Sequence, residues 1–265
     1  MSAVSITTLD LAMAALLLLL NGALSIAFQL KLERKLSIAA VRMLVQLALA
    51  GLVLSFVFRQ SSVGLTLVVA LVMGAVAGYE LWSRPARRID GWWSIGLGTG
   101  SLFLIALLST LFTVGVLIRP DPWYAPRYLL PILGMVLGNA LTSMSLTFDV
   151  LTTAAERERS AIEARIADGG TRLEAFEKVL ADALRAGTLP ILNSMAVAGV
   201  VALPGMMTGQ ILAGADPFEA AKYQMLILLV LAGAATLAVL AAGLGGVLLL
   251  TDARHRLRLD RLVAY

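Results

Sequence analysis

About seven long apolar runs dominate this sequence and restrict what it can fold into. Each is about 18 residues long or longer, the length that a helix needs to cross the roughly 30 Å hydrocarbon core of a bilayer. Charges rarely interrupt them, because only 14% of all residues are charged, against about 25% in ordinary soluble domains. We therefore expect an all-α integral membrane protein whose transmembrane helices lie at 8–29, 38–58, 63–82, 94–118, 129–149, 189–214 and 223–250.

The basic residues between these runs follow the positive-inside rule, by which cytoplasmic loops carry an excess of lysine and arginine. Four of the 21 basic residues fall in the predicted external loops and Arg42 lies inside a span, whereas the other sixteen lie in alternate segments, at 31–35, 84–88, 154–188 and 254–261. This predicts an external N-terminus and a cytoplasmic C-terminus. Because the charge is scattered among loops, the net charge of +4 does not indicate a nucleic-acid partner.

Residues that the chain lacks exclude several kinds of chemistry. It has no cysteine and a single histidine, His255, so disulfides, thiolate metal sites and histidine clusters cannot form. None of the four lysines follows a glycine, which rules out a Walker A phosphate loop, and no hydrolase motif is present. We therefore expect no catalytic residue and no enzyme. The ligands of any metal stay open, with oxygen or thioether groups as the candidates.

The longest polar segment, at 154–188, is predicted to fold into two cytoplasmic helices. Gly169 and Gly170 should end the first, and the sequence TRLE, from Thr171 to Glu174, is typical of a capping box that begins the second. A charged solvated loop, which is the alternative, needs no capping box and no apolar stripe. We therefore expect the stripe to contact a partner surface. It is made by Leu173, Phe176, Val179, Leu180, Ala183 and Leu184.

Three charged residues are predicted near the cytoplasmic ends of spans, namely Arg42, Glu80 and Asp149. Charges inside a membrane are costly and are functional candidates by default. Arg42 could pair with either acid. Two interpretations stay open: an ion pair that ties span ends together, or a gate that breaks during transport.

The sequence LPGMMTGQI, at 203–211, should break the sixth run near its middle. Pro204 removes a helical hydrogen bond, and Gly205 loosens the next residue. Backbone freed at membrane depth needs protein or a water-filled cavity around it, and many transporters form substrate sites at such breaks. A packing kink is the alternative. The candidate pathway residues are Pro204, Gly205, Met206, Met207, Thr208, Gly209, Gln210, Asn139, Met144 and Asn193.

Four stretches together resemble one known family. They are VRMLVQLALAGLVL (41–54), GNALTSMSLTFDVL (138–151), ERERSAIEARIADGGT (156–171) and the run at 189–224, which contains LPGMMTGQILAGADP. Over nearly the whole chain these are similar to the FetB-type permease family, which contains the bacterial iron-export permease and plant aluminium-tolerance membrane subunits. The resemblance implies the membrane-spanning permease subunit of an ABC transporter.

The same resemblance implies the partners and the location. Residues 1–265 would form a single transmembrane domain that assembles as a homodimer in a bacterial inner (plasma) membrane, with a separate ATP-binding subunit. This chain would carry no cofactor, since ATP and Mg would be bound by that ATPase. The coupling motif of ABC permeases matches Ile162, Glu163, Ile166, Gly169 and Gly170 as the contact with the ATPase. Asp168 and Gly170 depart from the family pattern, in which an apolar and a small residue stand at these positions.

Export of iron or a related metal ion is implied by the resemblance alone. Iron(II) prefers carboxylate or imidazole ligands, whereas the thioethers of Met206, Met207, Met144 and Met195 suit softer ions. Plant relatives are associated with UDP-glucose transport. A permease for an organic or nucleotide-sugar solute therefore stays as the alternative, and the direction of transport is likewise an expectation from the resemblance.

Overall fold

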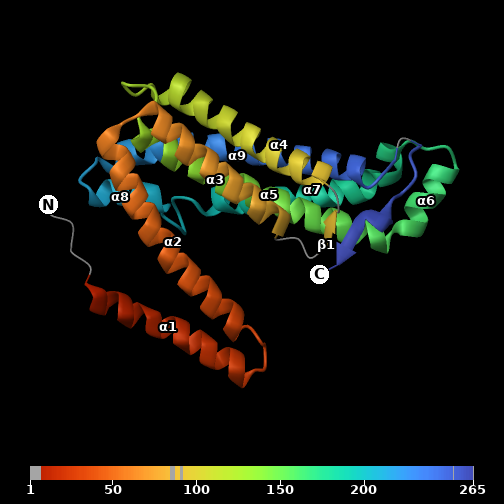
Figure 1. Ribbon diagram of the computed structural model, residues 1–265, viewed down its shortest axis with the longest axis horizontal. Helices are drawn as coiled ribbons and strands as arrows, with labels where there is room; N and C mark the ends of the chain where they lie inside the picture. Colours follow the sequence, from red (N-terminus) through yellow and green to blue (C-terminus); the bar gives the residue numbers. More distant parts are fainter. Residues whose placement is uncertain (1–6, 84–86, 90–91, 253, 265) are drawn as a thin grey trace. The chain divides into compact units, whose positions relative to one another are not determined.

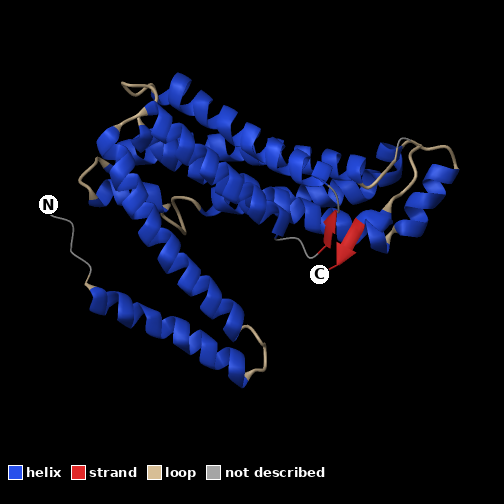
Figure 2. Cartoon of the chain, in the orientation of Figure 1, coloured by secondary structure: helices blue, strands red, loops and turns tan. Residues whose placement is uncertain are grey.

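A computed structural model describes residues 7–83, 87–89, 92–252 and 254–264 (Figure 1). Among these residues the chain is helical throughout, apart from one short two-stranded sheet and the connecting turns (Figure 2). The predicted all-α class is therefore confirmed. The chain divides into two compact units, one formed by the sequence up to Ser62 with Leu212–Gly214, the other by Val63–Ile211 with the sequence from Ala215 onward.

The first unit contains α1 (Thr8–Ala27) and α2 (Glu33–Gln60). Thr7 and Asp10 form a capping box at the start of α1. The turn between the helices is held by Ser25, whose hydroxyl donates to Glu33 Oε2 at 2.9 Å and accepts from the Leu32 amide at 2.9 Å. Most apolar side chains of both helices are exposed, as expected of helices whose solvent is lipid.

The second unit contains the remaining helices and the sheet. They are α3 (Val63–Ser83), β1 (Arg87–Ile89), α4 (Trp92–Phe112), the π-helical segment η1 (Thr113–Ile118), α5 (Pro126–Arg157), α6 (Arg159–Ala167), α7 (Arg172–Val197), α8 (Gly205–Leu212), α9 (Pro217–Leu249), the 3₁₀ turn η2 (Leu259–Arg261) and β2 (Leu262–Ala264).

Close packing of α5, α7 and α9 forms the core of this unit. Gly187 of α7 lies where the three helices meet: a methyl group there would contact the side chain of Thr147, and would lie 2.9 Å from the Ser143 carbonyl oxygen and 2.9 Å from Val239. Such small residues let helix backbones approach, which is the main way that membrane helices gain contact area. The core therefore depends on residues that are small as much as on residues that are apolar.

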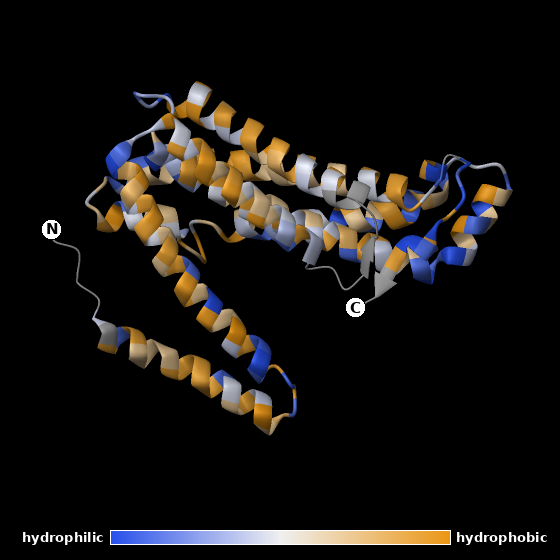
Figure 3. Ribbon diagram, viewed as in Figure 1, coloured by the Kyte–Doolittle hydropathy of each residue, from blue (hydrophilic) through white to orange (hydrophobic). Residues whose placement is uncertain are grey.

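Six described helices are long and apolar enough to cross a membrane, and all six correspond to predicted spans. Figure 3 shows their hydrophobic character, and shows hydrophilic residues gathered near α6. The remaining predicted span, the sixth at 189–214, is instead divided between the end of α7, an irregular stretch and the short helix α8. Whether it crosses the membrane stays a prediction.

The small sheet brings distant segments of the sequence together. β1 pairs antiparallel with β2, so that Arg87 lies opposite Ala264 and Ile89 opposite Leu262. The tail also reaches the start of α7, where the Arg172 amide donates to His255 Nδ1 at 3.2 Å. The described parts of three segments predicted to be cytoplasmic therefore lie together, which agrees with the alternation of basic loops and leaves the orientation itself a prediction.

Candidate functional site

The turn between α6 and α7 requires two consecutive glycines. Gly169 has a φ of +91°, a conformation that side-chain-bearing residues rarely adopt. The Gly170 amide donates to the Arg165 carbonyl at 3.0 Å, and a methyl group on Gly170 would lie 2.8 Å from that same oxygen. The predicted end of the first cytoplasmic helix, α6, is confirmed. Gly169 is required by its positive φ, and Gly170 by the close approach of the Arg165 carbonyl.

The predicted capping box at the start of α7 is also confirmed. The Thr171 hydroxyl oxygen accepts from the Glu174 amide at 3.4 Å, and Glu174 Oε2 accepts from the Thr171 amide at 2.7 Å. The hydrogen bonds that the Glu174 carboxylate accepts from the Thr171 amide, and then from the Thr171 hydroxyl at 2.8 Å, hold the pKa of Glu174 below its ordinary value. The turn is thus fixed on both sides, and α6 folds back along α7.

The apolar stripe of α7 meets its own chain, which corrects the expectation of an external partner. Phe176, Val179 and Ala183 are buried in a cluster that includes Leu151 of α5 and Val247 of α9. Leu173, at 48% exposure, is the stripe residue that stays outside. The sequence showed that the stripe needs a partner surface, but its pattern carries no information on whether that surface belongs to the same chain.

Ile162 requires the same correction. It was expected to contact an ATPase, but its side chain is only 2% exposed and joins the cluster around Phe176. Ile166 is partly buried against that cluster. Glu163, by contrast, is exposed, with Arg159 Nε donating to its Oε1 at 2.8 Å. Glu163 and the exposed Gly169 are therefore the predicted coupling residues that remain accessible.

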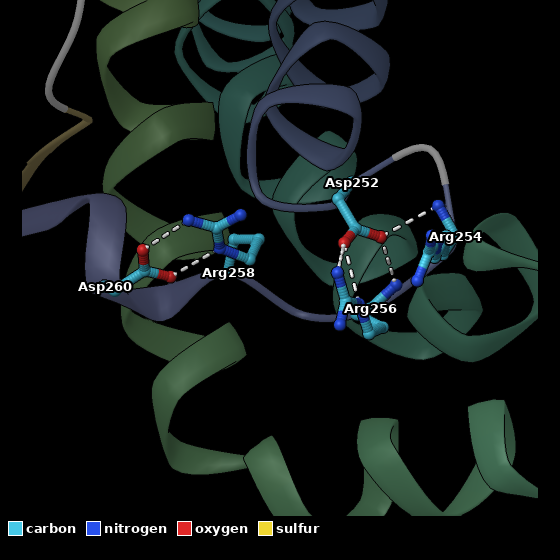
Figure 4. Close-up of polar contacts among 5 residues, drawn as sticks. All are labelled: Asp252, Arg254, Arg256, Arg258 and Asp260. Atoms are coloured by element: carbon cyan, nitrogen blue, oxygen red, sulfur yellow. Dashed lines mark hydrogen bonds and ion pairs between the residues drawn. The ribbon is translucent and has the colours of Figure 1, made fainter.

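The C-terminal tail completes this region, and sequence reasoning saw it only as a basic segment. Asp252 accepts hydrogen bonds from the amides of Arg254 and Arg256, both at 2.9 Å, and from Arg256 Nε at 2.8 Å (Figure 4). Arg258 makes two bonds to Asp260, at 2.8 and 2.7 Å. The available signal for this folded tail was the placement of three arginines at every second position between Asp252 and Asp260.

Hydrogen bonds and nearby positive charge lower the pKa values of the tail carboxyls. The hydrogen bond from Arg258 lowers the pKa of Asp260 to about 2. The amide of Arg256 is the main cause of the lowered pKa of Asp252. Beside the turn, Glu158 has a lowered pKa chiefly through the hydrogen bond from Arg157, with a further contribution from Lys178, whose Nζ lies 3.6 Å from the carboxylate. All of these groups are ionised at neutral pH.

The interruption after α7 lies earlier than a kink at Pro204 would place it. α7 ends at Val197, whose carbonyl accepts from the amides of Val201 and Ala202 at 3.1 and 3.0 Å, and Gly199 has a φ of +83°. Pro204 immediately precedes α8, a place where its missing N–H costs nothing. The helix therefore ends before Gly199, whose positive φ is not helical, and Pro204 lies directly before the start of the next helix.

The predicted pathway residues are divided between two surroundings. On α8, Met206, Met207, Thr208 and Gln210 are half-buried, Gly205 and Gly209 are exposed, and no residue is fully buried. Asn193 is exposed on α7. Met144 is a correction, because its side chain is 0% exposed within the bundle of the second unit and packs there as a core residue.

The exposed side of α5 carries several polar residues, with the half-exposed Met135 and Leu146 between them. Asn139, Thr142, Asp149 and Thr153 are spaced by three, seven and four residues, so they lie on one side of the helix, and all are exposed or half-exposed. The exposed face of α9 is instead apolar, with Leu229, Leu237, Leu240, Leu244 and Leu248. Of all described groups, none forms a hydrogen bond or ion pair with the Asp149 carboxylate. We refer to these four α5 residues as the polar face.

The predicted span-end charges are divided between the two units. Glu80 on α3 and Asp149 on α5 belong to the second unit, and Arg42 on α2 belongs to the first, so the pairing of Arg42 with either acid stays a prediction. The described residues also contain no group of three or more histidine, cysteine, aspartate or glutamate side chains able to hold a metal ion.

These features define a helical membrane protein that spans the bilayer several times and has a polar helix face and a folded, charged turn. The chain belongs to the uncharacterised protein family UPF0014, whose model matches residues 8–248. It is 34% identical to the UPF0014 membrane protein YjkA of Bacillus subtilis, over 83% of this chain and 85% of that protein.

Two further relatives have more specific names. The Arabidopsis thaliana protein ALUMINUM SENSITIVE 3 is 34% identical over 85% of this chain and 80% of its own length. The Escherichia coli protein named as a probable iron export permease, FetB, is 29% identical over 91% of both chains. The predicted family membership is confirmed. No solved structure matches the chain.

Proposed function

We propose that this chain is the membrane-spanning permease subunit of an ABC transporter that exports iron or a related metal ion. The polar face of α5 is the observation that carries the proposal. A carboxylate at the bilayer centre costs roughly 2.5–3.5 kcal/mol on insertion scales. Asp149 lies nearer the predicted end of its span, where the cost is smaller, but a side that also carries Asn139 and Thr142 is still better suited to water than to lipid. It is suited to a water-filled passage.

A single copy of the chain leaves this face open, so a passage requires a second element. A homodimer with two-fold symmetry would set the two polar faces opposite each other, since such an interface uses the same patch on both copies. Like charges at the two Asp149 positions would oppose a dry contact and favour water between them. In this arrangement the apolar faces of α9 meet lipid.

Energy for transport would come from a separate ATP-binding subunit in the bacterial inner membrane system, because this chain has no phosphate loop. The exposed part of the α6–α7 turn is the proposed contact. Glu163 and Gly169 are accessible there, and the turn is rigid because its glycines, its capping box and the tail all fix it. A rigid element transmits the movement of an ATPase better than a flexible loop does.

Co-purification tests this contact. We expect Glu163→Lys combined with Gly169→Lys to abolish binding of the ATPase encoded with this permease, because the first reverses an exposed charge and the second adds bulk at a positive φ. Glu219→Lys is the matched control, since Glu219 is also exposed and ion-paired but lies at the start of α9. Equal recovery of the ATPase with the double variant and with the control would contradict the assignment.

A permease for an organic or nucleotide-sugar solute such as UDP-glucose is the second candidate. The observation that favours it is the scarcity of metal ligands, since the described residues hold no cluster of acidic or histidine side chains. The names of the relatives favour metal ions, because the E. coli protein is named for iron export and the A. thaliana protein for aluminium sensitivity.

A further inference from the structure

A small cavity lies where α5 begins, beside α8 and α9. Its volume is about 240 Å³. The thioether side chains of Met135 on α5 and Met206 on α8 line it, together with Arg127 and Tyr128 from the first turn of α5 and Tyr223 from α9. None of these residues belongs to the α6–α7 turn or to the polar face.

The polar groups around this cavity have no partners within the described parts of the chain. The Arg127 guanidinium and the hydroxyls of Tyr128 and Tyr223 form no hydrogen bond or ion pair with any of those residues. A guanidinium presents five N–H donors in a planar fork, and each phenol adds one more. The cavity thus gathers donors that no described protein group receives, and because Arg127 and Tyr128 are exposed, their donors are accessible to a ligand as well as to water.

The position of Arg127 adds a second reason to expect an anion. It is the second residue of α5, and the first turn of that helix contains no acidic residue. Positive charge at a helix N-terminus is unfavourable, because the helix dipole and the free amides already make that end positive. A bound anion would be stabilised by both the guanidinium and the helix end, whereas a bare metal cation would be repelled by both.

We propose that this cavity binds the phosphate or carboxylate group of an amphiphilic molecule. The Arg127 guanidinium makes the charge-assisted hydrogen bonds, the hydroxyls of Tyr128 and Tyr223 donate further ones, and the first carbons beyond the anion contact Met135 and Met206. At 240 Å³ the cavity is smaller than pockets that enclose whole ligands, which run from about 300 Å³ upward. The rest of the molecule therefore extends outside.

Two sources share this chemistry, an anionic lipid headgroup and a soluble amphiphilic phosphate. The test uses the full-length chain in nanodiscs of phosphatidylcholine, to which radiolabelled hexyl phosphate is added, with hexylammonium as the cation control. In a parallel arm, native mass spectrometry compares the retention of phosphatidylglycerol with that of phosphatidylcholine. Binding at this cavity needs neither an ATPase nor a second copy of the chain, so failure here leaves the proposed transport function standing, and the reverse also holds.

We expect saturable binding of hexyl phosphate or selective retention of phosphatidylglycerol by the wild-type chain, and no binding of hexylammonium. Arg127→Gln should weaken the binding about tenfold or more, as expected for loss of a charge-assisted hydrogen bond. Tyr223→Phe should weaken it less, because it removes only one hydroxyl. Arg119→Gln is the matched control and should bind as wild type, since Arg119 lies outside the cavity, where its Nε donates to the Val116 carbonyl.

The pattern across the two arms identifies the source. Hexyl phosphate bound in phosphatidylcholine nanodiscs indicates a soluble ligand, whereas retention of phosphatidylglycerol without hexyl phosphate binding indicates a lipid. Absence of both in the folded wild-type chain would overturn the proposal. So would an Arg127→Gln variant that binds as tightly as Arg119→Gln, because Arg127 would then serve only to anchor the helix at the membrane surface.

Discussion

At the scale of single residues, the close packing of helices in the second unit depends on glycines at positions where a larger side chain would clash. Gly187 is the clearest of these, because the Ser143 carbonyl is backbone and cannot move aside as a flexible side chain can. Gly233 on α9 has the same residue type and the same helical backbone, but no atom lies within 4 Å of its missing methyl group. The two glycines therefore separate the effect of packing from the effect of helix propensity.

Gly187→Val should destabilise the purified protein, by about 1–3 kcal/mol if it behaves as other overpacked cores do. Gly233→Ala should leave the unfolding temperature unchanged or raise it slightly, because alanine favours helix more than glycine does. Thermal unfolding in detergent, followed by circular dichroism, measures both. An unfolding temperature for Gly187→Val equal to that of wild type would show that α7 does not approach α5 as closely as described.

At the scale of elements, the tail and the α6–α7 turn form one ionised structure outside the membrane. The carboxyls of Asp252, Asp260, Glu158 and Glu174 all have pKa values below their ordinary ones of 3.8 or 4.5. Because the folded state lowers these values, each carboxyl adds stability that is fully present above the ordinary pKa and is lost as the pH falls through the lowered one.

Amide hydrogen exchange of the tail should therefore depend on pH in a defined window. Protection of the Arg258 amide, which donates to the Leu250 carbonyl at 2.9 Å, should be constant above pH 4.5 and should decline as the pH falls from 3.8 to about 2. Exchange rates corrected for their intrinsic pH dependence measure this. Arg258→Met should flatten the decline, because it removes the main cause of the low pKa of Asp260. Constant protection down to pH 2 in the wild-type chain would contradict the description.

Local elements were predictable from the sequence wherever their signal is local. The glycines at 169 and 170 and the capping box from Thr171 to Glu174 act within five residues, and both predictions were confirmed. The predictions for Ile162 and Met144 were wrong because the sequence does not show whether an apolar side chain packs within its own chain or faces a partner or a passage. The helix break was displaced from Pro204 because a proline before a helix start resembles one that interrupts a helix.

At the scale of the whole molecule, the apolar runs predicted seven membrane helices, and six of these correspond to described helices that are long and apolar enough to span, since length and hydropathy alone define them. The polar face of α5 was only partly predicted, because Asn139 and Asp149 were assigned to different roles. Their spacing places both residues on one side of α5, but the exposure of that side depends on which sides of α5 the helices α3, α4, α7 and α9 cover. That information is tertiary and is absent from the pattern of any one helix.

Cross-linking of single-cysteine variants tests the proposed dimer. The chain contains no cysteine, so any cross-link made by one introduced cysteine must join two copies. We expect Thr142→Cys and Thr153→Cys, on the polar face, to form dimers with a short bifunctional thiol reagent and to react with membrane-impermeant maleimides. Leu240→Cys, on the apolar face of α9, is the control and should do neither. Dimers from the α9 variant alone would place the interface elsewhere.

The most direct test of the central proposal is ATP hydrolysis in proteoliposomes that contain this permease and its ATPase, titrated with iron(II), other metal ions and UDP-glucose. We predict that iron or another metal ion stimulates ATP hydrolysis saturably, and that this stimulation is lost when Asp149→Asn changes the polar face. Stimulation by UDP-glucose alone would retain the ABC architecture and contradict metal export. Hydrolysis that no solute alters, from an ATPase that does not bind the permease, would contradict the central proposal itself.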